Sequence, residues 1–247
     1  MTFRYTLTAA DLDPQGELPL SHLVKMIIEG STLHANDLGV GYDRLITRGH
    51  AWVLRRLSLG IARMPGMGDS FSMTTRVESV GPLSSERLFE LRSDSGEILV
   101  LARTSWVVID VMKRRLVPLG DLTELNAIAS QFEPNVAHGP RPRVSRTPDR
   151  KFSINVRYSD LDINRHVTTS RYVDYVDDAF TPEWHSTNRI TALDISFMRE
   201  TMPGEPMEAS VTDGNSHSQI DMLCSETPHV IATVSYVSRY PCKNQEM

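Results

Sequence analysis

Residues 152–177, FSINVRYSDLDINRHVTTSRYVDYVD, repeat without a gap the pattern of residues 3–28, FRYTLTAADLDPQGELPLSHLVKMII. The alignment sets Phe152 over Phe3, and each copy carries Asp-Leu-Asp at the same distance from that phenylalanine. A pattern that recurs in this way is the sequence signature of a duplicated structural unit. We therefore expect two copies of one unit. The alternative is a single mixed α+β domain with accidental symmetry.

The elements expected after each matched start also occur in the same order. Apolar residues recur at three- and four-residue steps from Leu20 in the first copy and from Tyr172 in the second, which predicts one long helix in each. Strand-like runs bounded by turn residues then follow, at 51–61, 70–80, 84–93 and 97–111 and again at 189–199, 206–213, 217–225 and 229–240. Short turns favour antiparallel pairing. The predicted α+β fold therefore has two curved antiparallel sheets, each wrapped around one long helix.

A linker is expected between the two copies. Residues 132–151, FEPNVAHGPRPRVSRTPDRK, are rich in proline and arginine and poor in apolar residues, which is typical of a connecting segment. This segment divides the chain into an N-terminal unit, residues 1–131, and a C-terminal unit, residues 152–247.

Composition indicates the cellular compartment and the classes of partner that the protein is expected to have. Apolar residues make up 40% of the chain, enough for a buried core, and the formal net charge of −5 disfavours a nucleic-acid partner. Cys224 and Cys242 form neither a disulfide framework nor a metal-ligand spacing, so we expect a reducing cytoplasm. The N-terminal sequence lacks a signal-peptide pattern and the apolar runs are too short to cross a bilayer, so no membrane partner is expected.

Asp162, Asn164 and His166 form the candidate catalytic group. On an extended segment, side chains two residues apart point to one face. An imidazole is the usual proton carrier, and a carboxylate can orient it, polarise water or attack a carbonyl. Thr168 is a suitable N-cap for the following helix, and backbone N–H groups near Val167 and Thr168 are candidate oxyanion donors. The alternative is that these residues only shape a turn and cap the helix.

The first copy lacks this imidazole. At the equivalent positions it keeps Asp13 but has Gln15 and Glu17. We therefore expect the second half to carry the chemistry and the first half to have another task, such as holding a substrate chain.

Metal sites and other hydrolase motifs are not supported by the spacing. The segment DLDINR begins like a calcium loop, but Arg165 stands where such a loop needs glycine and Arg171 where it needs glutamate. No second pair of His or Cys is spaced for zinc, and the chain contains no G-x-S-x-G elbow. Neither a metal nor a cofactor is expected.

The segment DLDINRHVTTSRYVDYV, residues 160–176, resembles the D-x-N-x-H-V-N-N-x-x-Y motif of acyl-acyl carrier protein (acyl-ACP) thioesterases. Other segments in the family's order are WVLRRL at 52–57, PGMGDSFSMTTRV at 65–77, ARTSWVVIDVMKRRLVPL at 102–119 and ISFMRET at 195–201. The resemblance implies a tandem (double) hotdog fold. It also implies hydrolysis of the thioester between a fatty acyl chain and the phosphopantetheine arm of acyl carrier protein, which terminates chain elongation.

The resemblance further implies that Asp162, Asn164 and His166 are catalytic, and it maps the family's acid to Glu200. Thr201 stands where many relatives have cysteine, so a cysteine nucleophile is not available there. His166 and Glu200 would then position and deprotonate water. Asp162 would either hold this network or attack the thioester carbonyl itself, and the sequence does not choose between these roles.

An acyl-chain slot is expected in the first half, between its long helix and its sheet. The candidate lining residues are Leu23, Met26, Ile27, Ser31, Trp52, Leu54 and Leu57. Ordinary core packing is the alternative for each of them. The acidic carrier protein would dock on local basic clusters. These clusters are Arg141, Arg143, Arg146, Arg150 and Lys151 in the linker, Lys113-Arg114-Arg115, and Arg165 with Arg171.

Two other functions stay open at this point. One is a non-catalytic module that binds acyl thioesters or docks a carrier protein, and the other is a hotdog acyl-coenzyme A thioesterase or dehydratase. The sequence leaves open acyl chain length and saturation, the choice between carrier protein and coenzyme A, and whether the protein is a monomer or a homodimer.

Overall fold

The computed structural model describes residues 1–122, 125, 129 and 136–240. The first half contains β1 (Thr2–Thr6), the 3-10 helix η1 (Ala9–Asp11), α1 (Leu20–Asp37), α2 (Tyr42–Ile46), β2 (His50–Ile61), β3 (Ser70–Val80), β4 (Ser85–Ser93), β5 (Ile98–Asp110), β6 (Arg115–Val117) and η2 (Leu119–Asp121). The second half contains β7 (Arg150–Ile154), η3 (Tyr158–Asp160), α4 (Thr169–Asp177), α5 (Pro182–Thr187), β8 (Asn188–Phe197), β9 (Met207–Asp213), β10 (His217–Cys224) and β11 (Thr227–Ser238).

The strands of the two halves pair in the same permuted order. The first half runs β1-β3-β4-β5-β2 and the second runs β7-β9-β10-β11-β8, with β6 added beside β5. Every pair between these strands is antiparallel. This shared permutation confirms the duplication and the α+β class expected from the repeat. The short elements α2, α5 and β6 were not predicted.

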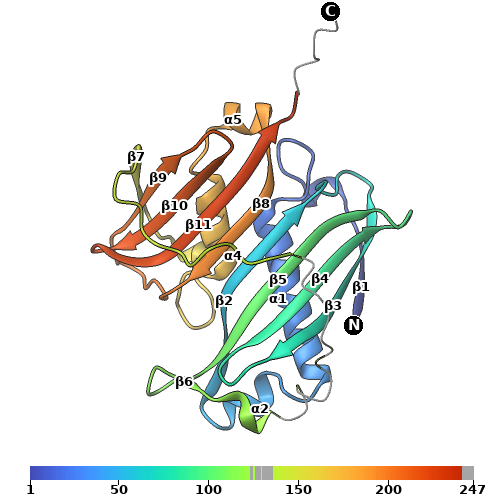
Figure 1. The fold of residues 1–247 in the computed structure, drawn as a ribbon, viewed down its shortest axis with the longest axis vertical. Coiled ribbons are helices and arrows are strands. Elements are labelled where there is room, and N and C mark those ends of the chain that lie inside the picture. Colours follow the sequence, from blue (N-terminus) through green and yellow to red (C-terminus); the bar gives the residue numbers. More distant parts are fainter. Residues whose placement is uncertain (123–124, 126–128, 130–135, 241–247) are drawn as a thin grey trace, which may run out of the picture.

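The two expected sheets form one continuous sheet (Figure 1). The halves meet where β2 pairs with β8, with Arg56 opposite Ser196 and Gly60 opposite Ala192. β2 and β8 are the last strands of their own halves, and an unpaired edge leaves N–H and C=O groups without partners. Joining the two edges satisfies these groups and places equivalent strands side by side across a local two-fold relation.

α1 and α4 lie on the same face of this sheet and pack against each other (Figure 1). Leu23 and Ile27 of α1 and Val173 and Val176 of α4 are completely buried, at the helical spacing that predicted both helices. Each such side chain contributes about 1.5–3 kcal/mol through burial. Buried residues of both halves belong to one core. None of the described helices is both long and apolar enough to cross a membrane.

The connection between the halves crosses the opposite face of the sheet. Residues 132–135 of the expected linker lie outside the described residues, and Arg150 and Lys151 at its end belong to β7. The part between them is bonded to the sheet: the Gly139 amide donates to Asp194 at 2.8 Å, and the Ser145 amide donates to Asp221 at 2.8 Å.

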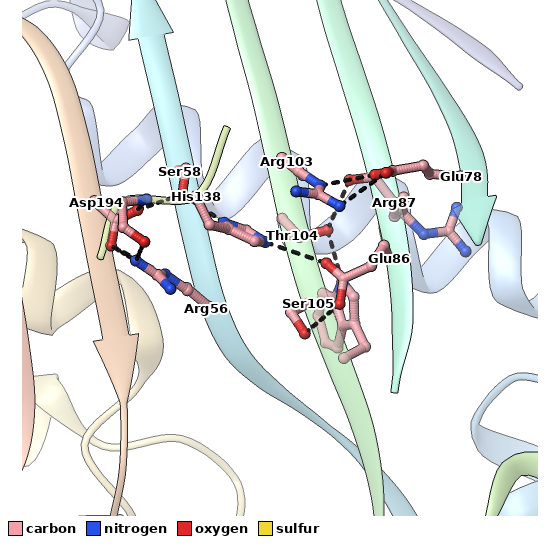
Figure 2. A network of polar contacts seen from close by, with 12 residues as sticks. Arg56, Ser58, Glu78, Glu86, Arg87, Arg103, Thr104, Ser105, His138 and Asp194 are labelled. Carbon is pink, nitrogen blue, oxygen red and sulfur yellow. Dashed lines mark hydrogen bonds and ion pairs between the residues drawn. The ribbon is translucent and has the colours of Figure 1, made fainter. Parts of the chain in front are cut away.

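His138 of this connection contacts two strands of the first half, β2 at the junction between the halves and β4 (Figure 2). Its Nδ1 lies 2.6 Å from Ser58 Oγ, and its Nε2 lies 3.1 Å from Glu86. Arg56 bonds Asp194 across the β2–β8 junction at 2.7 Å. These contacts hold residues 136–149 against the outer face of the sheet, so this part of the connection is not a free tether.

Candidate functional site

Asp162 organises a tight turn between η3 and α4. Its Oδ1 accepts hydrogen bonds from the backbone N–H groups of Asn164 at 2.8 Å and His166 at 3.0 Å. The Asp162 amide in turn donates to the His166 carbonyl at 2.8 Å, and Arg165 adopts a left-handed φ of 65°. The expectation of an extended segment with three side chains on one face is therefore wrong. A carboxylate followed by backbone amides competes well with extended structure, because it satisfies those amides locally.

The first copy builds the same turn. Asp13 Oδ1 accepts from the amides of Gln15 at 2.8 Å and Glu17 at 3.0 Å, and Gly16 takes a left-handed φ of 76° at the position equivalent to Arg165. The second copy thus keeps at Arg165 a conformation that costs a residue with a side chain about 1–2 kcal/mol. The shared geometry assigns Asp162 a structural role that the corresponding residue of the first copy also has.

His166 and Glu200 come together from separate parts of the second half, as predicted. The turn presents His166, and Glu200 follows the end of β8, so that His166 Nδ1 lies 3.6 Å from Glu200 Oε1. The His166 side chain is 20% exposed and that of Glu200 is 31% exposed, so both face solvent that substrate can displace. The pair can share a proton and activate a water molecule.

Arg114 of the first half completes this pair. Its guanidinium donates to Glu200 Oε2 from the turn between β5 and β6. From the sequence we predicted Arg114 only as part of a docking cluster, because its position along the chain does not relate it to Glu200. Pairing with Arg114 keeps one edge of the Glu200 carboxylate occupied and leaves the other edge toward His166.

An equivalent cross-half contact closes the first copy. Arg239, which follows β11, binds Glu17 with two bonds of 2.8 and 2.7 Å. Glu17 stands at the position of His166, so the first copy holds a salt bridge where the second holds an imidazole beside an acid. The position in the first copy is therefore filled by Glu17 and by Arg239 from the other half.

The proposed oxyanion donors Val167 and Thr168 are already bonded. The Val167 amide donates to the Thr201 carbonyl at 3.0 Å, and the Thr168 amide donates to the Asp160 carbonyl at 2.8 Å. Thr168 occupies the N-cap position as expected, without a side-chain capping bond. The amides of Thr169 and Ser170, at the first turn of α4, have no acceptor among the described residues, as is usual for a helix start. These amides replace Val167 and Thr168 as the available donors.

Thr201 lies beneath the site and is fully buried. Its hydroxyl bonds His229 Nδ1 at 2.8 Å, and its amide donates to the Tyr172 hydroxyl at 3.1 Å. Burial raises the pKa of Tyr172 to about 12, so this phenol stays protonated. Thr201 therefore supports the floor of the site and does not face substrate.

A cleft of about 1260 Å³ opens at the candidate catalytic residues and continues into the first half. Asp162, Asn164, His166 and Glu200 line one end of it. From the expected slot residues, Ser31, Trp52 and Leu54 line the cleft, whereas Leu23, Met26, Ile27 and Leu57 do not. These four are buried in the core between the helices and the sheet. The cleft instead follows a later stretch of α1, where Ile28, Ser31, Thr32 and Ala35 face it.

Glu205, Cys224 and His229 form a small cluster beside Thr201 that sequence reasoning did not single out. Their ligand atoms all lie within 4.8 Å of one another, which is close enough for a metal ion. They come from three separate segments of the second half, so no spacing along the chain could have indicated them. Glu205 and His229 also line the cleft.

Two family models match the chain. The acyl-ACP thioesterase N-terminal domain matches residues 1–124, and the acyl-ACP thioesterase C-terminal domain matches residues 145–235.

Curated plant proteins are similar to most of the chain. The chain is 24% identical to a palmitoyl-acyl carrier protein thioesterase of Cuphea hookeriana over 77% of this chain and 48% of that protein. It is 23% identical to a dodecanoyl-[acyl-carrier-protein] hydrolase of Cinnamomum camphora over 91% of this chain and 63% of that protein. The chain thus spans between about half and just under two thirds of the length of these relatives.

Solved structures share the complete architecture. An acyl-ACP thioesterase from Bacteroides thetaiotaomicron has a TM-score of 0.85 at 24% identity, covering 96% of this chain and 97% of that chain. The 12:0-ACP thioesterase from Umbellularia californica has a TM-score of 0.85 at 20% identity, covering 96% and 98%. These likenesses confirm the tandem hotdog fold.

Proposed function

Because the chain belongs to the acyl-ACP thioesterase family, we propose that it hydrolyses the thioester of a fatty acyl-acyl carrier protein and releases free fatty acid. The observation that carries the proposal is the His166–Glu200 pair at one end of a large cleft that reaches into the first half. Relatives named for palmitoyl and dodecanoyl substrates support fatty acyl chains on carrier protein as the substrate class.

In the proposed reaction His166 acts as the general base. Glu200 faces Nδ1, which favours the tautomer protonated there and leaves Nε2 to take a proton from water. The water oxygen attacks the thioester carbonyl, and collapse of the tetrahedral intermediate breaks the carbon–sulfur bond. His166 then returns the proton to the departing phosphopantetheine thiolate. The 3.6 Å separation of His166 and Glu200 is expected to shorten in the substrate complex, as catalytic contacts commonly do.

The start of α4 is the proposed oxyanion site. The amides of Thr169 and Ser170 carry the partial positive charge of the helix N-terminus, and Thr169 lines the cleft. Negative charge that develops on the carbonyl oxygen would be stabilised by these donors.

Asp162 and Asn164 are assigned supporting roles. The bonds from Asp162 Oδ1 to two backbone amides favour a positioning role for this carboxylate over direct attack. Asn164 is exposed at the cleft, so its amide can contact the thioester or the pantetheine arm.

Carrier protein is proposed to dock at the mouth of the cleft. Arg55 and Arg199 are exposed and line it, and Arg165 is exposed in the adjacent turn. In the linker cluster Lys151 pairs with Glu208 and Arg150 pairs with Asp213, whereas Arg141, Arg143 and Arg146 are exposed. The mouth therefore offers positive charge beside the reacting group, which suits an acidic carrier and its phosphopantetheine phosphate.

The proposal is tested by hydrolysis of acyl-ACP and acyl-coenzyme A thioesters over a series of chain lengths. His166→Ala should lower turnover by about 100-fold or more, the usual contribution of a general base. His217→Ala is the matched control, since His217 is exposed on β10 outside the cleft. Near-normal turnover by His166→Ala would contradict the assignment.

The same experiment separates the alternative functions. A binding module would bind acyl-ACP without releasing acid, and a dehydratase would yield an enoyl thioester. Faster turnover of coenzyme A thioesters than of carrier-protein thioesters would favour an acyl-coenzyme A thioesterase.

A further inference from the structure

Arg87 on β4 is a buried cation on the wall of the cleft. It is 5% exposed and lies on the inner face of the sheet together with Phe89 and Leu91. The cleft is lined by Arg87 and also by Ser85, two residues earlier on the same face. Ser85 is likewise 5% exposed, and its hydroxyl has no partner among the described residues.

The guanidinium of Arg87 has few partners. A single nitrogen, Nη1, contacts His34 Nδ1 at 2.5 Å and Thr75 Oγ1 at 3.4 Å. Burial and the nearby guanidinium lower the pKa of His34 to about 4, so this imidazole is neutral and accepts the bond. Nε and Nη2 of Arg87 have no acceptor in the described part of the chain, and no described carboxylate pairs with it.

Two other arginines of the same sheet, both on its outer face, are paired with carboxylates. Arg103, on the neighbouring strand, binds Glu78 with two bonds of 2.8 Å, and Arg56 binds Asp194 (Figure 2). In the same view the Arg87 guanidinium points away from this outer network. The two outer arginines, Arg56 and Arg103, therefore have counter-ions, whereas buried Arg87 at the cleft wall has no carboxylate partner among the described residues.

An unpaired buried charge is costly, and an alkyl chain laid over it would remove what solvation it retains. A ligand oxygen at this place would instead supply the missing acceptor, with a charge-assisted bond to the free edge of the guanidinium. The cleft wall at Arg87 and Ser85 is thus suited to oxygen and unsuited to a purely hydrocarbon chain.

The position of Arg87 sets where that oxygen must be. Arg87 pairs with Thr104, Thr104 with Leu57, and Leu57 with Ile195 of β8. Arg87 therefore lies about three strand spacings, or roughly 14 Å, across the sheet from the strand that leads to Glu200. An oxygen beside the thioester is too far away, and only the distal part of a chain reaches Arg87.

We infer that the cleft selects acyl chains that carry a hydrogen-bond acceptor oxygen on their distal part, as a hydroxyl, a carbonyl or a carboxylate group. This inference rests on the proposed acyl-thioester function and names its substrate class. A carboxylate is expected to bind most strongly, because it neutralises the guanidinium as well as accepting its hydrogen bonds.

The test uses amide analogues of acyl-pantetheine, which bind without being hydrolysed. Unsubstituted, terminal-hydroxy and terminal-carboxy chains are compared by calorimetry over a series of lengths, with wild type, Arg87→Met and Arg92→Met. Arg92 is the matched control, since it lies on the same strand outside the cleft. Wild type should bind an oxygenated chain about tenfold or more tightly than its unsubstituted counterpart at the best length. Arg87→Met should abolish or reverse this preference, and Arg92→Met should keep it.

Three results would overturn the inference. In the first, wild type shows no preference for oxygenated chains at any length. In the second, Arg87→Met weakens the binding of all chains equally. In the third, Arg87→Met only allows longer unsubstituted chains to bind, as expected if Arg87 merely blocks the end of the cleft. If Arg87→Met does not fold, Arg87→Lys keeps the charge without the planar fork and should reduce the preference; an unchanged preference would count against the inference. Because binding is measured without turnover, failure of hydrolysis in the parallel thioester assay would overturn the proposed function alone.

Discussion

Replacing Asp162 by asparagine separates its two conceivable roles, holding the turn and attacking the thioester. In the structure Oδ1 accepts the amides of Asn164 and His166, and an asparagine side-chain oxygen can accept the same two bonds. Asparagine cannot act as a carboxylate nucleophile. If Asp162 positions the turn, Asp162→Asn should keep activity within about tenfold of wild type, well above the roughly 100-fold loss expected for a missing general base.

Asp162→Ala removes both hydrogen bonds, so it measures how much they contribute to the stability of the fold. Bonds to a carboxylate are worth about 1.5–3 kcal/mol each. The turn is partly exposed, so we expect a total nearer to that of a lost helix cap, about 2 kcal/mol. For a chain of this size that lowers Tm by about 4–8 °C. Asp13→Ala removes the same two contacts from the first copy, so it should lower Tm similarly while leaving turnover nearly unchanged.

The assays are thermal unfolding and hydrolysis of one acyl-ACP substrate by the three variants. The positioning role would be refuted if Asp162→Asn lost activity as completely as His166→Ala with an unchanged Tm. A charge or a nucleophile at Asp162 would then be required.

Two further predictions concern charged side chains, Arg114 beside Glu200 and Asp177 in α4. Arg114→Met should lower kcat by about tenfold with little change in Tm, because it removes the exposed partner of Glu200. The control Arg115→Met, at the first residue of β6, should change neither quantity, and equal kcat in both variants would show that Arg114 does not act on Glu200. Burial, together with neighbouring carboxylates, raises the pKa of Asp177 to about 8. The unfolded chain releases this proton near pH 4, whereas the folded state keeps it up to about pH 8. The free energy of unfolding therefore falls as pH rises between these two values. Asp177→Asn should therefore raise Tm at pH 8, with a gain that vanishes toward pH 4 and that exposed Asp43→Asn does not reproduce; a gain independent of pH would contradict the assignment.

Local patterns predicted the elements of the fold well. The apolar spacing that marked Leu23 and Ile27 is buried in α1, and the equivalent spacing that marked Val176 is buried in α4, because a helix on a sheet must hide that stripe. The same burial explains why Leu23, Met26, Ile27 and Leu57 lie in the core and do not line the cleft. Apolar spacing identifies the side of a helix that is covered, but it does not distinguish a side covered by core from one left open beside a cleft.

The candidate site shows the same limit. The polar pattern at Asp162 and His166 located the site, but its geometry was mistaken, since Asp162 bends the chain by accepting backbone amides. The partnership of Glu200 with Arg114 was not visible, because the two residues are far apart in sequence and come from different halves.

The sequence by itself determined the duplication, the order of the main helices and strands, the family, and the segment that carries His166. These follow from short-range periodicity and from motifs, which any copy of the chain displays before it folds. Only the tertiary structure decided that the two sheets are one, that Arg114 of one half completes the acid of the other, and that the cleft passes Arg87. Each depends on the β2–β8 junction, which joins the halves through main-chain hydrogen bonds. Main-chain N–H and C=O groups can form these bonds whatever side chains the strands carry, so no local sequence pattern predicts the junction.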